Sequence, residues 1–255
     1  MTDDIVTERV APIEALIFDM DGLLVDSEPI AERALDQFLQ LHGHTLRPET
    51  MEQTLGRRLP EAMTLIADLY GIALPVADLT KTYDELRLAA LRGNLEPMPG
   101  AAALLTYARA AGLKLALATS SQRSHADLSL AETHLAGLFD AEATGDEVTH
   151  GKPAPDIFLL AAERLDTPPE ACVVLEDAPA GLAAAAAAGM RRVWVPNPKT
   201  RGLPVAVPVD LTAPDLEAVI PWLETHGVSV SASNNDPGDP EPAAIRAGSP
   251  GGDNG

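Results

Sequence analysis

The chain has 255 residues, of which 46% are hydrophobic and 4% are aromatic, and its formal net charge at pH 7 is −20. This length and apolar content suit one sizeable domain, or one domain that carries a smaller inserted domain. The strong negative charge argues against nucleic acid or an anionic membrane surface as a partner. It does not exclude anionic substrates, because a bound divalent cation can reverse the local field of an acidic cleft.

The single cysteine and the ends of the chain add expectations about location. Cys172 excludes an intramolecular disulfide and indicates a reducing compartment, and its apolar neighbours predict that it is buried. Residues 1–10 are acidic and do not resemble a signal peptide, and no apolar window is long enough to span a membrane. We therefore expect a cytoplasmic protein whose ends, residues 1–10 and 228–255, are disordered.

The first predicted element is a short buried strand at residues 13–18, which ends abruptly at Asp19. Three helical patterns follow, at residues 29–43, 59–70 and 76–91. No strand-like segment interrupts them before residue 96. A crossover between parallel strands usually needs only a dozen or more residues and one helix. The extra length therefore predicts an all-helical insert at residues 29–95, placed over the carboxyl end of the first strand.

Regular alternation of helices and strands resumes after residue 100. The predicted helices are residues 101–111, 124–135, 155–165 and 179–188, and the predicted strands are residues 113–118, 141–144, 171–175 and 192–195. A last helix is predicted at residues 212–226, with Thr212 as its cap and Pro214 in its first turn. Such alternation is typical of a parallel sheet covered by helices on both faces.

The predicted fold class is therefore α/β, with a doubly wound, Rossmann-like core and an inserted α-helical cap domain. The core is expected at residues 11–28 and 96–227, and the cap at residues 29–95.

Polar residues follow three of the predicted strands, and a lysine lies in a loop nearby. Asp19 and Asp21 follow the first strand, Thr119 and Ser120 the second, and Glu176 and Asp177 the strand at 171–175, while Lys152 lies in the loop His150-Gly151-Lys152-Pro153. In open α/β sheets, ligands bind outside the carboxyl ends of the strands, where the strand order reverses. One Asp at a strand end is more often a cap or turn residue. The convergence of several polar residues instead predicts an active site.

These residue types suit the transfer of a phosphoryl group. Its negative oxygens hinder attack by a carboxylate unless their charge is neutralised, which Mg²⁺ with oxygen ligands can do. Lys152 would add a point charge, and the Thr119 hydroxyl would hold further oxygens. Asp19 would attack phosphorus to form an aspartyl-phosphate. Asp21 would protonate the leaving alcohol and then take a proton from the hydrolytic water.

The same residues resemble the motifs of the haloacid dehalogenase superfamily of phosphohydrolases. The matching segments, in order, are Phe18-Asp19-Met20-Asp21-Gly22, Ala118-Thr119-Ser120, Gly151-Lys152-Pro153-Ala154-Pro155-Asp156 and Glu176-Asp177. The resemblance implies a nucleophile at Asp19, a general acid/base at Asp21, phosphate binders at Thr119, Ser120 and Lys152, and Mg²⁺ ligands at Asp19, Glu176, Asp177 and the Asp21 carbonyl. It also implies that the helical insert is the superfamily's small cap, in which Arg57 and Arg58 are candidate substrate contacts.

Longer stretches resemble particular members of the superfamily. Residues 150–159 and 175–190 resemble pseudouridine-5′-phosphatases, whereas residues 18–29 and 54–58 resemble hexose-phosphate phosphatases equally well. The sequence therefore predicts hydrolysis of a small phosphorylated metabolite, either a sugar phosphate or a nucleoside or pseudouridine monophosphate. The expected assembly is a monomer or a weak homodimer.

Two alternative functions stay open. β-Phosphoglucomutases, which residues 18–28 also resemble, carry a cap-hinge histidine shortly after the paired aspartates. Ala31 occupies the matching position here, and His42 is the nearest histidine, so the mutase interpretation is weakened. A noncatalytic receiver domain also gathers acidic residues, a hydroxyl and a lysine around Mg²⁺. Receivers, however, are shorter and lack a cap.

Overall fold

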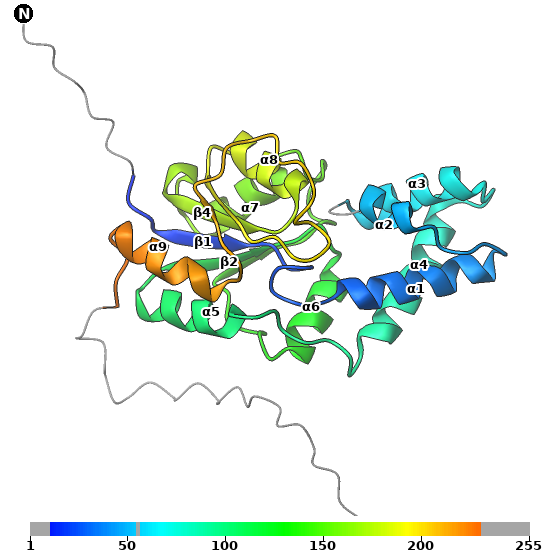
Figure 1. Cartoon of the computed structure of the whole chain (residues 1–255), viewed down its shortest axis with the longest axis horizontal. Helices are drawn as coiled ribbons and strands as arrows, with labels where there is room; N and C mark the ends of the chain where they lie inside the picture. Colours follow the sequence, from blue (N-terminus) through cyan, green and yellow to red (C-terminus); the bar gives the residue numbers. More distant parts are fainter. Residues whose placement is uncertain (1–10, 55–56, 231–255) are drawn as a thin grey trace, which may run out of the picture.

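The centre of the computed structural model, which describes residues 11–54 and 57–230, is a six-stranded sheet (Figure 1). The strands are β1 (Ala15–Phe18), β2 (Lys114–Ala118), β3 (Ala141–Ala143), β4 (Cys172–Glu176), β5 (Arg191–Trp194) and β6 (Leu211–Thr212). Their order is β3-β2-β1-β4-β5-β6, and all neighbouring pairs run parallel. The strand order reverses beside β1, as the predicted doubly wound core requires.

Side chains alternate between the two faces of this sheet. In β1, Leu16 and Phe18 join one apolar cluster, while Ala15 and Ile17 join another on the opposite face. Helices α5 (Ala101–Ala110), α6 (Arg123–Glu132) and α9 (Ile220–Thr225) cover the first face, and α7 (Asp156–Arg164) and α8 (Pro179–Ala187) cover the second. Burial on both faces explains why the central strands are almost continuously apolar.

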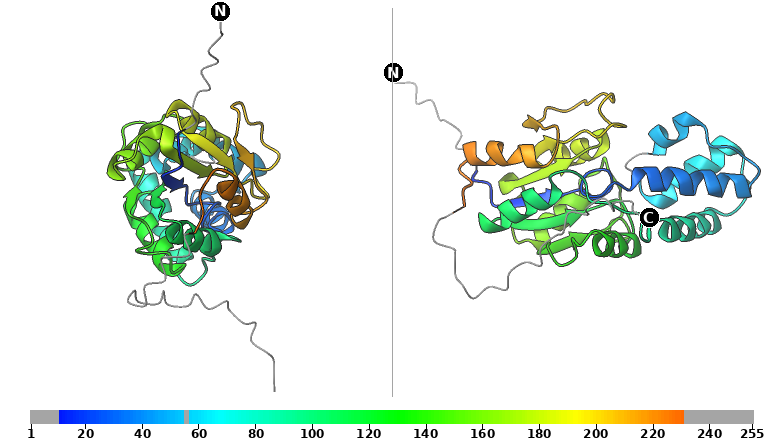
Figure 2. Two further views of the ribbon diagram at one scale, coloured as in Figure 1. Left: turned by 90° about the vertical axis from the view of Figure 1, so that its left-hand side faces the viewer. Right: turned by 60° about the horizontal axis from the view of Figure 1, so that its bottom comes forward.

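A separate helical unit is inserted between β1 and β2. It consists of α1 (Glu28–Leu41), α2 (Pro48–Thr54), α3 (Leu59–Tyr70) and α4 (Val76–Leu91). These helices pack around their own apolar cluster, which includes Phe38, Met63 and Tyr83. Figures 1 and 2 place the unit beyond the end of the sheet toward which β1 runs. It is the predicted cap, although its limits at residues 29 and 95 stay a prediction.

The prediction for the last helix is wrong at its start. Leu211–Thr212 forms the edge strand β6, and the main-chain amide of Ala213 donates to the carbonyl of Trp194, 2.9 Å away. The chain becomes helical only later, through a 3₁₀ turn at Glu217–Val219 that leads into α9. Asp215, rather than Thr212, accepts a hydrogen bond from the amide of Ala218 at 2.9 Å. Pairing with β5 therefore overrides the capping potential of Thr212.

Other local predictions have mixed outcomes. Helix α2 was missed, because it is short and only Thr50 on it is buried. The predicted disorder at residues 1–10 and 228–255 lies outside the described residues except at 228–230. There it is wrong for Val228, which is buried and whose carbonyl accepts a hydrogen bond from the Tyr107 hydroxyl at 2.9 Å. Cys172 is buried as predicted. Among the described residues, no helix is both long and apolar enough to cross a membrane.

Candidate active site

The predicted catalytic residues converge where β1, β2 and β4 end. A cavity of about 130 Å³ lies there, and the predicted site residues that line it are Asp19, Asp21, Arg57, Thr119, Ser120, Lys152, Glu176 and Asp177. Arg58 is not among the residues that line this cavity. The wall on the cap side is mostly apolar and includes Leu35, Met51, Leu59, Ala62 and Ile66. The site is thus an acidic sheet edge covered by an apolar cap surface.

Lys152 supplies the buried positive charge of the site. Its Nζ donates to Oδ1 of Asp19 and to Oε1 of Glu176, each at 2.5 Å, and to the carbonyl of Ala118 at 3.3 Å. Its side chain is only 2% exposed. Burial lowers the pKa of Lys152, but the two carboxylates raise it more, so the ammonium is retained. Such a buried charge is costly to desolvate, which makes a structural role alone a weak explanation.

Three carboxylates form a cluster that fits a divalent cation. Asp19, Glu176 and Asp177 are all buried, and one oxygen of each lies within 4.8 Å of the others. Burial raises the pKa of Asp19 and Asp177, and neighbouring carboxylates raise it further, outweighing the opposing effect of Lys152. One lysine cannot balance three buried carboxylates once they have lost their protons. Oxygen donors with this excess of negative charge are the ligands that Mg²⁺ prefers.

Asp21 lies beside this cluster but has different partners. Its Oδ1 accepts hydrogen bonds from Ser27 Oγ at 2.5 Å and Arg87 Nη2 at 3.1 Å, and lies 3.2 Å from His125 Nε2. Its Oδ2 accepts from Ser121 Oγ at 2.6 Å. Burial alone would raise the pKa of Asp21, but these partners hold it well below its usual range. These contacts fix the orientation of the Asp21 carboxyl group.

Two glycines permit the close approach of side chains in the predicted site. A Cβ at Gly181 would lie 1.8 Å from Oε1 of Glu176, so only glycine fits on this turn of α8. Gly22 has φ +79°, and a Cβ there would lie 2.7 Å from Nδ2 of Asn197 and 2.9 Å from Oδ2 of Asp177. The Asn197 amide donates to that Asp177 oxygen at 2.8 Å. Both glycines thus help to place the acidic cluster.

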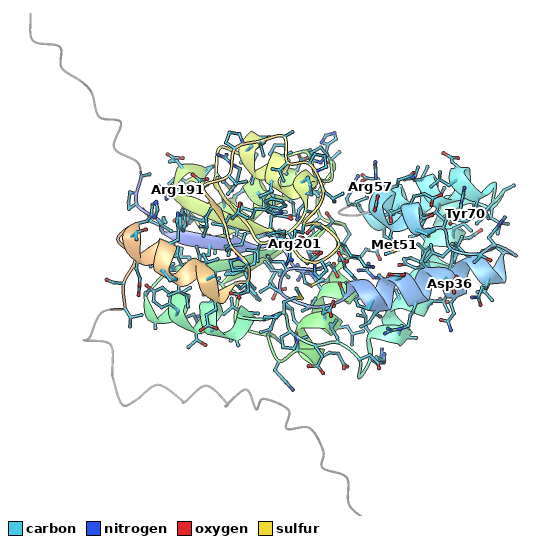
Figure 3. The ribbon with its side chains drawn as sticks, viewed as in Figure 1. Asp36, Met51, Arg57, Tyr70, Arg191 and Arg201 are labelled. Atoms are coloured by element: carbon cyan, nitrogen blue, oxygen red, sulfur yellow. The ribbon has the colours of Figure 1, made fainter. Side chains whose placement is uncertain are left out.

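The two candidate cap arginines have different surroundings. Arg57 lines the cavity, and its Nε donates to the carbonyl of Gln53 at 2.9 Å. Figure 3 shows Arg57 at the end of the cap that faces the core. Arg58 instead pairs with Glu61 and donates from Nη1 to the core carbonyl of Val148 at 2.9 Å. Arg57 thus lies in the cavity, where its contact with a substrate stays a prediction, whereas Arg58 joins the cap to the core.

Sequence reasoning missed several residues of the site. They are Ser27, Arg87, Ser121, His125, Gly181 and Asn197. Ser121 directly follows the predicted Thr119-Ser120 pair, and Gly181 interrupts a run rich in alanine, so both carried a signal. Arg87 and His125 carried none, because Arg87 reaches Asp21 only through the docking of α4 near α6, and His125 reaches it only through the packing of α6 in the core.

Comparison with known proteins agrees with this geometry. Residues 13–189 match the haloacid dehalogenase-like hydrolase family. The chain is 36% identical over 189 residues to a probable pseudouridine-5′-phosphatase of Drosophila melanogaster, covering 72% of this chain and 81% of that protein. It is 33% identical over 182 residues to a phosphorylated carbohydrates phosphatase of Thermotoga maritima, covering 71% and 84% respectively.

The fold is also shared with a solved structure, that of CbbY from Rhodobacter sphaeroides in complex with phosphate. The TM-score is 0.74 with 31% sequence identity, over 81% of this chain and 96% of the other. The family match, the identity to its phosphatases and the convergence of the motif residues lead to one conclusion. The chain belongs to the haloacid dehalogenase-like hydrolase family and is a phosphoric monoester hydrolase.

Proposed function

We propose that this chain is a Mg²⁺-dependent phosphatase that hydrolyses a small phosphorylated metabolite through an aspartyl-phosphate on Asp19. The observation that carries the proposal is the contact between Lys152 and Asp19 inside the acidic cluster, with Asp21 alongside. Asp19, Asp177, the Asp21 carbonyl and Glu176 would hold Mg²⁺. When bound, this ion would neutralise charge on the phosphate oxygens.

In the first step, Lys152 and the Thr119 and Ser120 positions would bind the phosphate oxygens. A carboxylate oxygen of Asp19 forms a bond to phosphorus, and the bond from phosphorus to the ester oxygen breaks. Asp21 gives its proton to that departing oxygen, which leaves as an alcohol.

In the second step, water attacks the phosphorus of the aspartyl-phosphate. The bond from phosphorus to the Asp19 oxygen breaks, and Asp21 takes one proton from the water. Inorganic phosphate leaves, and both aspartates return to their starting states, Asp19 as a free carboxylate and Asp21 with its proton. Ala31 also lines the cavity, at the position where the mutases carry a histidine. It offers only a methyl group, which favours water over a sugar as the acceptor.

The cap wall supports a nucleoside or pseudouridine monophosphate over a hexose phosphate. Its apolar side chains, such as Met51 and Ile66, can pack against a planar base. A sugar that buried several hydroxyls against them would leave those hydroxyls without hydrogen-bond partners, at a cost. Arg57 could then meet the polar edge of the base. Both substrate classes occur among the names of the relatives.

A phosphate-release panel tests this proposal. Purified protein would be assayed with Mg²⁺ against pseudouridine, nucleoside and hexose monophosphates, and against p-nitrophenyl phosphate. We expect activity that is lost with EDTA and in Asp19→Asn, and a higher kcat/KM for the base-containing substrates. Hexose phosphates with the highest kcat/KM would reject the proposed substrate class. No phosphate release from any compound would reject the phosphatase mechanism itself.

A further inference from the structure

Four side chains hold the carboxylate of Asp21, and only one of them comes from the cap helices. Ser27 directly precedes α1, Ser121 follows β2, and His125 lies on α6. Arg87 lies on α4 of the cap. The contact from Arg87 to Asp21 therefore exists only when the cap is seated on the core, whereas the other three contacts do not depend on α4.

Arg87 is directed at Asp21 by the packing of α4. One turn earlier on this helix, Tyr83 is buried, and its hydroxyl donates to the carbonyl of Ala31 at 3.2 Å. That bond fixes α4 against α1. The Arg87 side chain is 14% exposed, and its Nε is buried without a hydrogen-bond partner among the described residues. Asp21 is the carboxylate with which its guanidinium forms an ion pair.

His125 reaches the same oxygen from the core. It is 1% exposed, and its Nε2 lies 3.2 Å from Oδ1 of Asp21. Because a carboxylate can only accept, Nε2 carries the hydrogen. Its Nδ1 is buried and has no hydrogen-bond partner within the described part of the chain. Within the described part of the chain, the ring of this buried histidine is thus hydrogen-bonded to Asp21.

We propose that Arg87 and His125 are positioning residues that fix Asp21 for the hydrolysis of the phosphoenzyme, with Arg87 acting only while the cap is closed. This inference rests on the proposed function, in which Asp21 takes the proton of the attacking water. The three donors on Oδ1 fix the plane of the carboxylate, and a base must be aimed closely at the proton it removes.

Hydrolysis of the phosphoenzyme would therefore depend on cap closure. In the step concerned, a water oxygen bonds to phosphorus, its proton passes to Asp21, and the bond from phosphorus to Asp19 breaks. Opening of the cap would withdraw Arg87 and leave Asp21 with Ser27, Ser121 and His125. The phosphoenzyme would then be hydrolysed fastest under a closed cap, after the alcohol has left.

Steady-state and rapid-quench kinetics with p-nitrophenyl phosphate and Mg²⁺ test this inference. In Arg87→Met, slow hydrolysis should lower kcat and KM together by at least about tenfold, with kcat/KM within about twofold of wild type. A burst of p-nitrophenolate and an acid-stable phosphoenzyme should appear. Arg87→Lys should recover part of the rate, because it restores the charge without the guanidinium geometry. His125→Phe should change the constants in the same direction.

Controls separate this inference from the proposed function. Arg92→Met changes an exposed arginine just beyond the end of α4 and should behave like wild type. The inference would be overturned, while the function stands, by one combination of results. In it, the wild-type enzyme turns over and Asp21→Asn accumulates phosphoenzyme, but the kinetic constants of Arg87→Met are unchanged. A raised KM in Arg87→Met with an unchanged rate of phosphoenzyme hydrolysis would also overturn it, since Arg87 would then contact only substrate. No phosphoenzyme in Asp21→Asn would instead contradict the function.

Discussion

The carboxylate of Glu176 occupies the space that a side chain at Gly181 would need: a Cβ there would lie 1.8 Å from Oε1. The same oxygen accepts the hydrogen bond from Lys152, while Oε2 accepts one from the amide of Ala178 at 3.0 Å. Helix α8 therefore reaches Lys152 through one carboxylate. A glycine inside an alanine-rich helix is otherwise unfavourable by about 1 kcal/mol.

We predict that Gly181→Ala loses activity even though alanine is the better helix former. The new methyl group would displace Glu176, and Lys152 would lose one of its two anionic partners. We expect kcat to fall by at least about tenfold, since misplacement by about 1 Å can cost more than this. The check is kcat measured beside Gly202→Ala, where a Cβ meets nothing within 4 Å. Equal activity in the two variants would show that Glu176 does not need this space.

The two acidic residues after β4 should differ in their effect on Mg²⁺. Both oxygens of Glu176 already accept hydrogen bonds, whereas Asp177 accepts one at Oδ2 from Asn197. We predict that Asp177→Asn weakens Mg²⁺ binding by at least about tenfold and that Glu176→Gln weakens it less. Trp194 is a convenient reporter, because its Nε1 donates to the main-chain carbonyl of Asp177 at 2.9 Å.

The measurement is a Mg²⁺ titration followed by tryptophan fluorescence, with calorimetry as a second method. Trp194→Phe, which should lose the fluorescence change but retain the heat of binding, identifies the reporter. A larger loss of affinity in Glu176→Gln than in Asp177→Asn would reverse the assignment of the stronger ligand.

Binding of Mg²⁺ should strengthen as the pH rises. Burial raises the pKa of Asp19 and Asp177, so each holds a proton to higher pH in the metal-free protein than in the unfolded chain. Mg²⁺ must displace those protons, so its affinity should increase between about pH 6 and about pH 8. By the same linkage, the metal-free protein should become less stable as the pH rises through this range, because its folded state binds more protons.

Calorimetric titrations in buffers of different ionisation enthalpy would report the protons released on Mg²⁺ binding. An affinity that does not change with pH, together with no proton release, would contradict the buried, protonated carboxylates.

The cap arginines should have separable kinetic effects. Arg57 lines the cavity, so Arg57→Met should raise KM for the preferred substrate more than for p-nitrophenyl phosphate. Arg58 bonds the core carbonyl of Val148, so Arg58→Met should loosen cap closure and lower kcat/KM by a similar factor for every substrate. The comparison needs KM and kcat for both compounds in both variants. The two assignments would be contradicted if Arg58→Met lowered kcat/KM for the preferred substrate alone and Arg57→Met lowered it equally for both compounds.

The sequence was most informative where local chemistry and position coincide. Asp19 follows an apolar strand, and in open α/β sheets ligands bind at the carboxyl ends of the parallel strands. The place of Asp19 in the site therefore did not depend on how the helices pack. The helices at residues 59–70 and 76–91 were predicted with the bounds that the structure shows for α3 and α4, because Gly71 and Pro75 separate the two helical patterns. The helix at 212–226 failed because pairing of β6 with β5 is a tertiary effect.

The partners of Asp21 could not be predicted for a related physical reason. Arg87 and His125 are separated in sequence and meet only because the cap docks beside α6. Nothing in the local pattern of either helix distinguishes them from a solvated arginine or a packed histidine. Likewise, the adjacent Arg57 and Arg58 have different partners, the carbonyls of Gln53 and Val148. This difference depends on the way the start of α3 meets the core, which the local sequence does not show.

The most direct test of the central role of Asp19 is to trap its phosphorylated form. Asp21→Asn would be mixed with p-nitrophenyl phosphate and Mg²⁺, quenched in acid, digested with pepsin and analysed by mass spectrometry. We predict one phosphoryl group on the peptide that contains Asp19, and none when Asp19→Asn is added to the same background. Phosphorylation at another residue, or hydrolysis that continues in Asp19→Asn at the wild-type rate, would contradict the assignment of Asp19 as the nucleophile.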